Sequence, residues 1–362
     1  MQHLLLEPYH QQLGAQLTDF HGWKMPARYS SIKEEVLAVR TGVGIFDISH
    51  MGEIIIDGND AEIFLDTLLP NAVAALHDGQ ALYSPLCRED GTIVDDLLVY
   101  RFTSRRYMLV VNASNRQKDY DHIAAAVGNY AVTINDISDT IVLLAVQGPQ
   151  SANVVRNVFP GSIDNLNYFY FTTVSFNGHD ILIARTGYTG EHGYELYIPA
   201  EAAESVWKEL YNAGQEYALK PCGLGARDVL RLEAGLSLYG NEIDDTTSPF
   251  DAGIGWTVKQ KGNMHTYIGY EALLKAKQHP KKTTIGIITS GRIPRKGTTV
   301  LKDGTPLGVV TSGTFSFALN NGIALCAVTP HSTAPDDVVT LDLGSGQNAT
   351  VVRPPFIMPQ TK

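Results

Sequence analysis

The sequence predicts an α+β protein with mainly antiparallel sheets and a small β-rich domain at its carboxyl-terminal end. Between Ile45 and about Tyr130, strand-like runs alternate with two helical stretches. A linker-like composition follows at Lys277–Thr283, and beyond it the turn dipeptides Asp303-Gly304 and Asn321-Gly322 separate short strands. This spacing indicates an all-β domain of about 80 residues.

Local signals place the individual elements along the chain. The polar and aromatic stretch DFHGWKMPARYSS is expected to be a loop, and in the helix that follows Ser31 and Glu34 form a capping box and Gly42 ends the last turn. Strands are expected at Glu53–Ile56, Ala81–Cys87, Thr92–Phe102, Tyr107–Asn112, Ile141–Gln147, Tyr168–Phe176, Ile181–Thr186 and Tyr194–Pro199. Further helices are expected at Asp60–Leu69, Asn115–Val127, Ser151 to about Val158, Glu201–Glu216 and Gly223–Tyr239.

Composition and charge argue against several classes of function. A net charge of −10 disfavours a general nucleic-acid or membrane-surface binder, and no apolar run is long enough to span a bilayer. The three isolated cysteines and the lack of a signal- or transit-peptide pattern lead us to expect the cytoplasm. The eleven histidines form no metal-binding pair, so no metal site is expected, and His50 is expected to be structural.

The run GTIVDDLLVY, residues 91–100, contains two aspartates inside an apolar strand. Aspartate is depleted in strands, and a buried carboxylate has to be paired or neutralised. Two interpretations of Asp95 and Asp96 stay open. Either one of them pairs structurally and the other lies at a wet edge, or one is a half-enclosed carboxylate with a raised pKa, ready for proton chemistry.

Hairpin geometry separates the two aspartates. A loop over Arg88–Gly91 would place Tyr83 opposite Asp96, whereas a turn of only Asp90-Gly91 would place Pro85 opposite it. Side chains alternate between the two faces of a strand. Either register therefore puts four residues on one face: Tyr83, Val94, Asp96 and Leu98.

A second candidate site is the glycine-rich stretch RTGYTGEHGYEL, residues 185–196. Three closely spaced glycines let a backbone approach a ligand or adopt positive φ. In the strand that follows, Glu195 lies beside Tyr197 on one face. The glutamate could accept two parallel hydrogen bonds from an amidine-like heterocycle edge. The alternative is the exposed polar face of an edge strand.

A third candidate is GLGARDVLRLEAG, residues 223–235. Asp228 stands where a dinucleotide fingerprint needs its third glycine, so no nicotinamide or flavin site is expected here. Arg227 and Arg231 lie one helical turn apart. Either could hold a carboxylate, or pair with Asp228 or Glu233.

Several stretches together resemble one family, the aminomethyltransferases or T-proteins of the glycine cleavage system. They are FHGWKMP, RTGVGIFDISHMGE, YSPLC, GTIVDDLLVY, NASNRQKD, QGPQS, RTGYTGEHGYEL, GLGARDVLRLEAGLSLYGNEID and SGTFS. The resemblance implies three domains arranged as a cloverleaf around a central folate channel. The carboxyl-terminal domain is expected to be a small β-barrel or jelly-roll-like domain. The implied division is a folate-binding region over 1–280, formed by two interleaved subdomains with the second at about 51–135, and a β domain over 281–362.

The same resemblance implies a reaction and its partners. The one-carbon unit of an aminomethyl group, carried on the lipoyl sulfur of the H-protein, passes to tetrahydrofolate. Ammonia is released, and methylenetetrahydrofolate and dihydrolipoyl H-protein remain. No metal, flavin or nicotinamide cofactor is implied.

Residue by residue, the family's essential aspartate falls on Asp96, its pterin-reading carboxylate on Glu195 and its folate-site arginine on Arg227. Other positions that match the channel lining, or lie next to it, are Tyr83, Asn112, Tyr168, Tyr188, Met51 and Trp256. The family's tail usually carries a basic residue near the folate glutamate. The tail here reads VVRPPFIMPQTK, which leaves the role of Arg353 open.

Two relatives of this family are alternatives. Flavin-dependent demethylating dehydrogenases append the same fold to an amino-terminal dinucleotide domain, which this sequence lacks. A folate-binding protein of iron–sulfur cluster assembly binds folate without group transfer. It carries a lysine-glycine-cysteine stretch ending in Gly-Gln-Glu, where this chain reads LKPCGLGARD.

Overall fold

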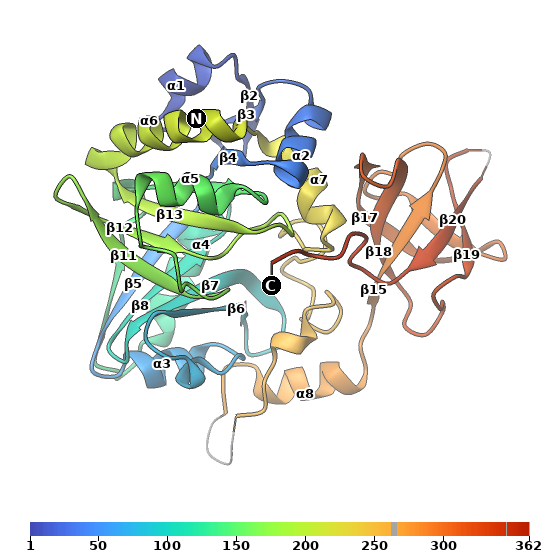
Figure 1. The fold of residues 1–362 in the computed structure, drawn as a ribbon. Helices are drawn as coiled ribbons and strands as arrows, with labels where there is room; N and C mark the ends of the chain where they lie inside the picture. The colour runs from blue at the N-terminus through green and yellow to red at the C-terminus, as the bar shows by residue number, and fades with distance from the viewer. Residues whose placement is uncertain (262–265, 345, 362) are drawn as a thin grey trace.

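The computed structural model describes residues 1–261, 266–344 and 346–361, and its body is formed by two sheets that pack face to face (Figure 1). The six-stranded sheet has the order β11-β12-β13-β10-β4-β14, antiparallel except where β14 runs parallel to β4. Its strands are β4 (Gly44–Asp47), β10 (Ile141–Gln147), β11 (Phe171–Phe176), β12 (His179–Ala184), β13 (Gly193–Pro199) and β14 (Lys220–Pro221).

The second sheet is fully antiparallel, with the order β6-β7-β8-β5-β9. Its strands are β5 (Gly52–Gly58), β6 (Gln80–Cys87), β7 (Ile93–Thr103), β8 (Arg106–Val111) and β9 (Val132–Asp136). The predicted strands are present, with small shifts at their ends, and the mainly antiparallel α+β class is confirmed. The strands β4, β9 and β14 were not predicted.

Helices cover the outer faces of both sheets, which gives four layers (Figure 1). The helices α5 (Ser151–Val158) and α6 (Ala203–Gly214) pack on the six-stranded sheet, and α3 (Ala61–Leu68) and α4 (Arg116–Ala126) pack on the five-stranded sheet. Strand β10 is buried on both faces: Leu144 faces the helices, while Leu143 faces the other sheet. This burial explains why the strand reads as a continuous apolar run.

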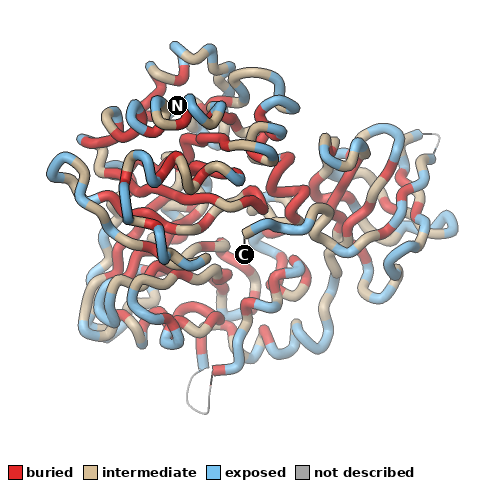
Figure 2. Tube along the Cα trace, in the orientation of Figure 1, coloured by how far each residue is buried: buried red, intermediate tan, exposed pale blue. Residues whose placement is uncertain are grey.

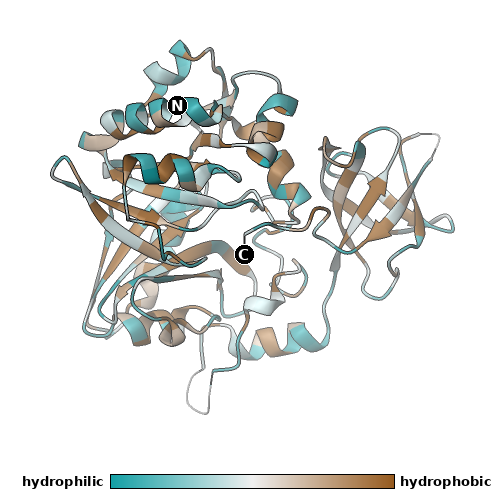
Figure 3. Ribbon diagram, in the orientation of Figure 1, coloured by the Kyte–Doolittle hydropathy of each residue, from teal (hydrophilic) through white to brown (hydrophobic). Residues whose placement is uncertain are grey.

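The carboxyl-terminal strands form a closed barrel with the order β15-β18-β17-β16-β19-β20. They are β15 (Thr283–Thr289), β16 (Thr299–Lys302), β17 (Thr305–Ser316), β18 (Asn321–Val328), β19 (Val338–Leu341) and β20 (Gln347–Val352). The predicted small β domain is therefore a barrel. Buried, hydrophobic residues run along its strands and those of both sheets, whereas the preceding helix α8 (Tyr270–Gln278), which was not predicted, is largely exposed (Figures 2 and 3).

The amino-terminal stretch that we expected to be a loop is a small sheet, so this expectation is wrong. Strands β2 (Gln16–Phe20) and β3 (Trp23–Arg28) form a hairpin. The strand β1 (Gln2–His3), which precedes the short helix α1 (Glu7–Gln12) in the sequence, pairs with β3. The two turn residues His21 and Gly22 both have positive φ, 51° and 85°. Two such residues match the right-handed twist of a hairpin.

The helix α7 contacts the barrel, and the helix α2 packs against α7. The helix α2 (Ile32–Thr41) has the predicted capping box and ends at Gly42. The helix α7 (Leu224–Glu233) is shorter than the predicted Gly223–Tyr239, because Gly235 adopts a φ of 70° that ends the helical backbone. Single 3-10 turns lie at Val73–Ala75, Ser138–Thr140, Ala200–Ala202, Gln215–Tyr217 and Gly255–Thr257.

Gly235 also contacts the carboxyl-terminal tail. A Cβ at Gly235 would lie 2.9 Å from Cβ of Pro354, whereas a Cβ at Gly240, with a φ of 90°, would meet nothing within 4 Å. Alanine at either position bears the cost of a side chain in the left-handed region, about 1–2 kcal/mol. Only Gly235→Ala must also displace the tail. We expect urea denaturation to show a larger loss of unfolding free energy for Gly235→Ala than for Gly240→Ala, and equal losses would contradict tight packing of the tail.

Candidate active site

The β6–β7 hairpin holds the aspartate pair in one of the two predicted registers. Pro85 pairs with Asp96 and Tyr83 with Leu98, as a two-residue turn would require. A bulge between Leu86 and Cys87 then shifts the register, so the loop itself does not have the predicted two-residue form. Tyr83 is thus the diagonal neighbour of Asp96 on the same face.

The bulge corrects the prediction for Val94. Leu86 pairs with Asp95 and Cys87 pairs with Ile93, which leaves Val94 as the extra residue of β7. Its side chain packs in the buried cluster of Leu97 on the face away from Asp96. An inserted residue reverses the alternation of side chains, so Val94 does not enclose Asp96.

Asp96 accepts hydrogen bonds on both of its oxygens. The hydroxyl of Tyr83 donates to Oδ2 at 2.8 Å, and Nδ2 of Asn112 donates to Oδ1 at 3.0 Å. Burial, and after it the negative charge of Asp95, raises the pKa of Asp96 to about 7, while the two hydrogen bonds act in the opposite direction. This carboxyl group can therefore gain or lose a proton near neutral pH.

Asp95 points to the other side of β7 and is fully buried. It accepts from the backbone N of Asn112 at 2.9 Å, from Nδ2 of the same residue at 2.9 Å and from Nδ2 of Asn115 at 2.7 Å. The amide of Asn112 thus bridges the two carboxylates. The structural role that we considered for one member of the pair therefore fits the contacts of Asp95.

Asp119 on α4 is a buried acid that the sequence reasoning missed. Its side chain is fully buried beside Asp95, and burial together with that neighbour's charge raises its pKa to about 11. Asp119 is therefore protonated at neutral pH. The only signal in the sequence was the recurrence of polar residues one turn apart in NASNRQKD.

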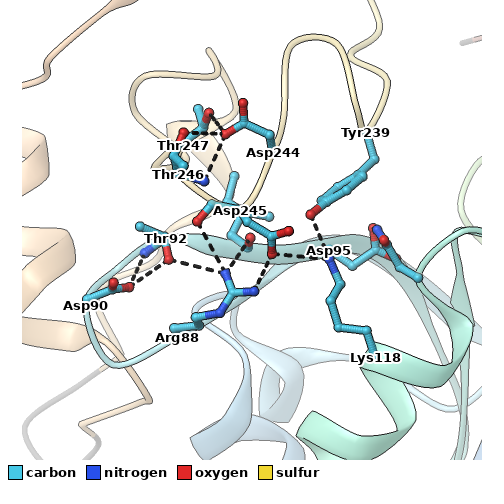
Figure 4. Close-up of polar contacts among 12 residues, drawn as sticks. Arg88, Asp90, Thr92, Asp95, Lys118, Tyr239, Asp244, Asp245, Thr246 and Thr247 are labelled. Carbon is cyan, nitrogen blue, oxygen red and sulfur yellow. Dashed lines mark hydrogen bonds and ion pairs between the residues drawn. The ribbon is translucent and has the colours of Figure 1, made fainter.

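A polar cluster next to Asp95 ties the hairpin to the segment after α7 (Figure 4). Lys118 donates to the hydroxyl of Tyr239 at 2.7 Å and lies 3.3 Å from Oδ1 of Asp245. Arg88, in the hairpin loop, also pairs with Asp245 and donates to the carbonyl of Ile93 at 3.0 Å. These contacts hold the strand that carries Asp96.

Glu195 lies on β13, between β12 and β10, and is 5% exposed. The alternative of an exposed edge strand is therefore wrong. Thr186 donates its hydroxyl proton to Oε2 of Glu195 at 2.5 Å. Burial raises the pKa of Glu195, while this hydrogen bond and the charge of Arg227 lower it.

Arg227 is half-buried, and its guanidinium has no hydrogen bond or ion pair within residues 1–261, 266–344 and 346–361. Its guanidinium carbon lies 4.7 Å from the ring centre of Tyr188. The positive charge interacts with Glu195, and with burial it lowers the pKa of His50 to about 3. An unpaired guanidinium next to an aromatic ring is suited to an anionic ligand.

Arg231 is fully committed to structural contacts, unlike its neighbour one turn earlier. It is 1% exposed, lies 2.7 Å from Asp228 and 3.0 Å from Glu242, and donates to Ser312 of the barrel at 2.8 Å. The structural alternative in the sequence therefore holds for Arg231.

The remaining predicted residues lie at different distances from this centre. Tyr188 interacts electrostatically with Asp96 as well as with Arg227, so it lies near both groups. The ring of Trp256 is 6.1 Å from that of Tyr83 and 63% exposed. Tyr168 lies close to Glu195 and to Thr361 of the tail.

Two further residues named from the sequence are Met51 and Arg353. Met51 packs partly buried against the core between the sheets. Arg353 is exposed just after β20, while the part of the tail that reaches the glycine-rich loop is Gln360, which donates to the carbonyl of Gly190 at 2.7 Å. Across the described residues, no group of three metal-ligating side chains lies together, and no helix has the length and apolar character to cross a membrane.

Comparison with known proteins gives matches along nearly the whole chain. The GCVT N-terminal domain matches residues 6–262, and the glycine cleavage T-protein C-terminal barrel domain matches residues 279–357. The chain is 45% identical over 351 residues to the aminomethyltransferase of Halothermothrix orenii, covering 96% of this chain and 98% of that protein. It is 43% identical over 348 residues to that of Thermotoga neapolitana, covering 96% and 95%.

A solved structure agrees with these relatives. The crystal structure of glycine cleavage system aminomethyltransferase T from Bartonella henselae matches with a TM-score of 0.92 and 34% identity, over 99% of both chains. Identity at this level over the full length confirms the resemblance carried by the motifs. The chain belongs to the aminomethyltransferases, the T-protein family of the glycine cleavage system, and is a transferase.

Proposed function

We propose that this aminomethyltransferase moves the methylene carbon from aminomethyl-lipoyl H-protein to tetrahydrofolate. The products are ammonia, methylenetetrahydrofolate and dihydrolipoyl H-protein. The observation that carries the proposal is the Asp96 carboxyl group, held by Tyr83 and Asn112 with a pKa of about 7, in a chain of this family.

Asp96 acts on the folate amine that attacks the methylene carbon. Its carboxylate accepts a hydrogen bond from that amine and takes up the amine proton as the first carbon–nitrogen bond forms. This proton returns to the departing amino group, which leaves as ammonia. A second folate nitrogen then closes the methylene bridge, which breaks the carbon–sulfur bond, and its proton passes to the lipoyl sulfur. A pKa of about 7 suits this role, because proton transfer is most effective when the pKa lies near the working pH. The hydrogen bonds from Tyr83 and Asn112 fix the direction of the carboxylate.

Glu195 and Arg227 bind the folate and do not take part in the chemical step. The carboxylate of Glu195 accepts hydrogen bonds from the pterin edge, and the free guanidinium of Arg227 supplies the positive charge for an anionic group. Tyr83, Tyr168, Tyr188, Met51 and Trp256 line the same site. We also propose that the chain is divided into a folate-binding region over 1–280, whose second subdomain lies at about 51–135, and a β domain over 281–362.

The proposed partner is the lipoyl-bearing H-protein, and the proposed compartment is the cytoplasm. Cys87, Cys222 and Cys326 are free and buried, which supports a reducing compartment.

The direct test mixes this protein with aminomethylated H-protein and tetrahydrofolate and measures ammonia. We expect ammonia release that depends on all three components. Folate binding without ammonia release would instead favour a non-catalytic folate-binding relative.

The aspartate pair allows a matched comparison. Asp96→Asn should lower turnover about 100- to 10,000-fold, the usual contribution of a positioned proton acceptor, while folate binding is retained. Asp95→Asn should be far milder, because Asp95 points to the other side of β7, where it accepts hydrogen bonds from Asn112 and Asn115. Steady-state turnover and equilibrium folate binding check both variants. Similar losses of turnover in the two variants would rule out the separate role of Asp96.

The pH dependence of turnover gives a further prediction. Asp96 has to be ionised to accept a proton, so turnover should fall as the pH drops through about 7. Asp95→Asn removes a neighbouring negative charge and should move this limb to lower pH. Tyr83→Phe removes a hydrogen bond to the ionised form and should move it to higher pH. Profiles of turnover against pH for the three proteins check this, and shifts in the same direction would contradict the assignment.

A further inference from the structure

Three buried hydroxyl groups form a chain that ends on Glu195. Tyr197 donates to the hydroxyl of Tyr100 at 3.0 Å, the hydroxyls of Tyr100 and Thr186 lie 3.3 Å apart, and Thr186 donates to Oε2 of Glu195 at 2.5 Å. The exposed fractions of these four residues are 3%, 0%, 3% and 5% in that order. None of the three residues is among those matched to the family's site, although Thr186 lies in the glycine-rich stretch and Tyr197 was expected beside Glu195 on one strand face.

The carboxylate sets the direction of every hydrogen bond in this chain. An ionised carboxylate only accepts, so Thr186 gives its single proton to Glu195 and can only accept from Tyr100. Tyr100 has then used its own proton and accepts from Tyr197. All three protons therefore point toward Glu195, and donors linked in this way strengthen one another.

The row of three hydroxyl groups is held in place by the packing of the two sheets. Tyr100 lies on β7 of one sheet and Tyr197 on β13 of the other, and their rings meet edge to face with centres 5.5 Å apart. Phe171 packs on Tyr100 in the same way at 5.4 Å. The position of the donor to Glu195 is thus set by the core between the sheets.

The three hydroxyl groups occupy only one oxygen of Glu195 and leave the other for another partner. Oε2 is occupied by Thr186, and Oε1 accepts no hydrogen bond from the residues that the structure describes. The other charged or titratable groups that face Glu195 are Arg227 from α7, Tyr168 ahead of β11 and the two tyrosines of the chain. Glu53 on β5 faces the tyrosine end of the chain.

The geometry points to Thr186, supported by Tyr100 and Tyr197, as a positioning residue that orients Glu195 and leaves Oε1 for the heterocycle edge of the folate. The inference rests on the proposed role of Glu195 in folate binding. A pterin edge with two N–H groups then meets one free oxygen and one that already accepts a proton.

The test compares Thr186→Val, which keeps the shape but removes the hydroxyl, with Thr186→Ser, which keeps the hydroxyl. The probe is 5-formyltetrahydrofolate, and its dissociation constant is measured by equilibrium dialysis across a range of pH. Thr186→Val should weaken binding about 10-fold at neutral pH, the effect of losing one hydrogen bond to a charged group, and should move the loss of binding on acidification to higher pH. Thr186→Ser should stay close to the wild type in both respects.

A matched control is Thr189→Val. Thr189 is also buried in the glycine-rich loop, but it donates to Oε1 of Gln147 at 2.9 Å and not to Glu195. This variant should leave the pH dependence of folate binding unchanged. If Thr186→Val does not fold, Tyr197→Phe, which removes only the outermost donor, should produce a smaller shift in the same direction.

A Glu195→Gln variant distinguishes the folate-binding role of Glu195 from the positioning role of Thr186. If it weakens folate binding while neither Thr186→Val nor Tyr197→Phe changes the pH dependence, the positioning role is wrong and the function of Glu195 stands. If Glu195→Gln binds folate as tightly as the wild type, both the role of Glu195 and the inference built on it are overturned.

Discussion

The packing of the two sheets against each other is the constraint on which the rest of the structure depends. Their shared core buries Tyr100 from β7 and Tyr197 from β13, and it also buries Ala226 and Leu230 from α7. Sheets packed in this way keep about 10 Å between their backbones, so side chains of both reach a common layer. Because Asp96 lies on β7 and Glu195 on β13, the same packing sets how the proposed chemical group stands relative to the proposed binding group.

The helix α7 connects this core to the barrel. Its Glu233 is fully buried, accepts from Arg40 of α2 at 2.7 Å and accepts from Ser316 of β17 at 2.6 Å. Leu232 packs in one apolar cluster with Leu325 of β18. A buried carboxylate with partners in two other elements is costly to separate from either of them. The guanidinium of Arg227, on the same helix, has no hydrogen bond or ion pair with the residues that the structure describes.

Burial and hydrogen bonding act against each other at both carboxylates of the site. Burial disfavours the charged form of Asp96 and of Glu195, and donated hydrogen bonds restore part of it. At Asp96 the second charge of Asp95 adds to burial, which brings its pKa to about 7. At Glu195 the nearby Arg227 opposes burial. The pKa values of the two acids on facing sheets are therefore set by different neighbours, Asp95 for Asp96 and Arg227 for Glu195.

The sequence by itself determined what depends on neighbours along the chain. The capping box of α2, the strands around the aspartate pair and the opposite directions of Asp95 and Asp96 all follow from short-range rules of propensity and alternation. Nearly contiguous motifs were also sufficient to indicate the family. The hairpin at His21-Gly22 was missed although its signal is local, because the surrounding residues are polar and aromatic.

The tertiary structure decided what depends on contacts between distant segments. The bulge that turns Val94 away from Asp96 cannot be deduced from a pattern that fits two registers equally well. The separate fates of Arg227 and Arg231 depend on the barrel, whose Ser312 lies 81 positions away from Arg231 in the chain. The hydroxyl chain behind Glu195 joins residues from both sheets, 97 positions apart at Tyr100 and Tyr197. Alternation along a strand indicates on which face a side chain lies, but only the packing of the elements determines which residues it contacts.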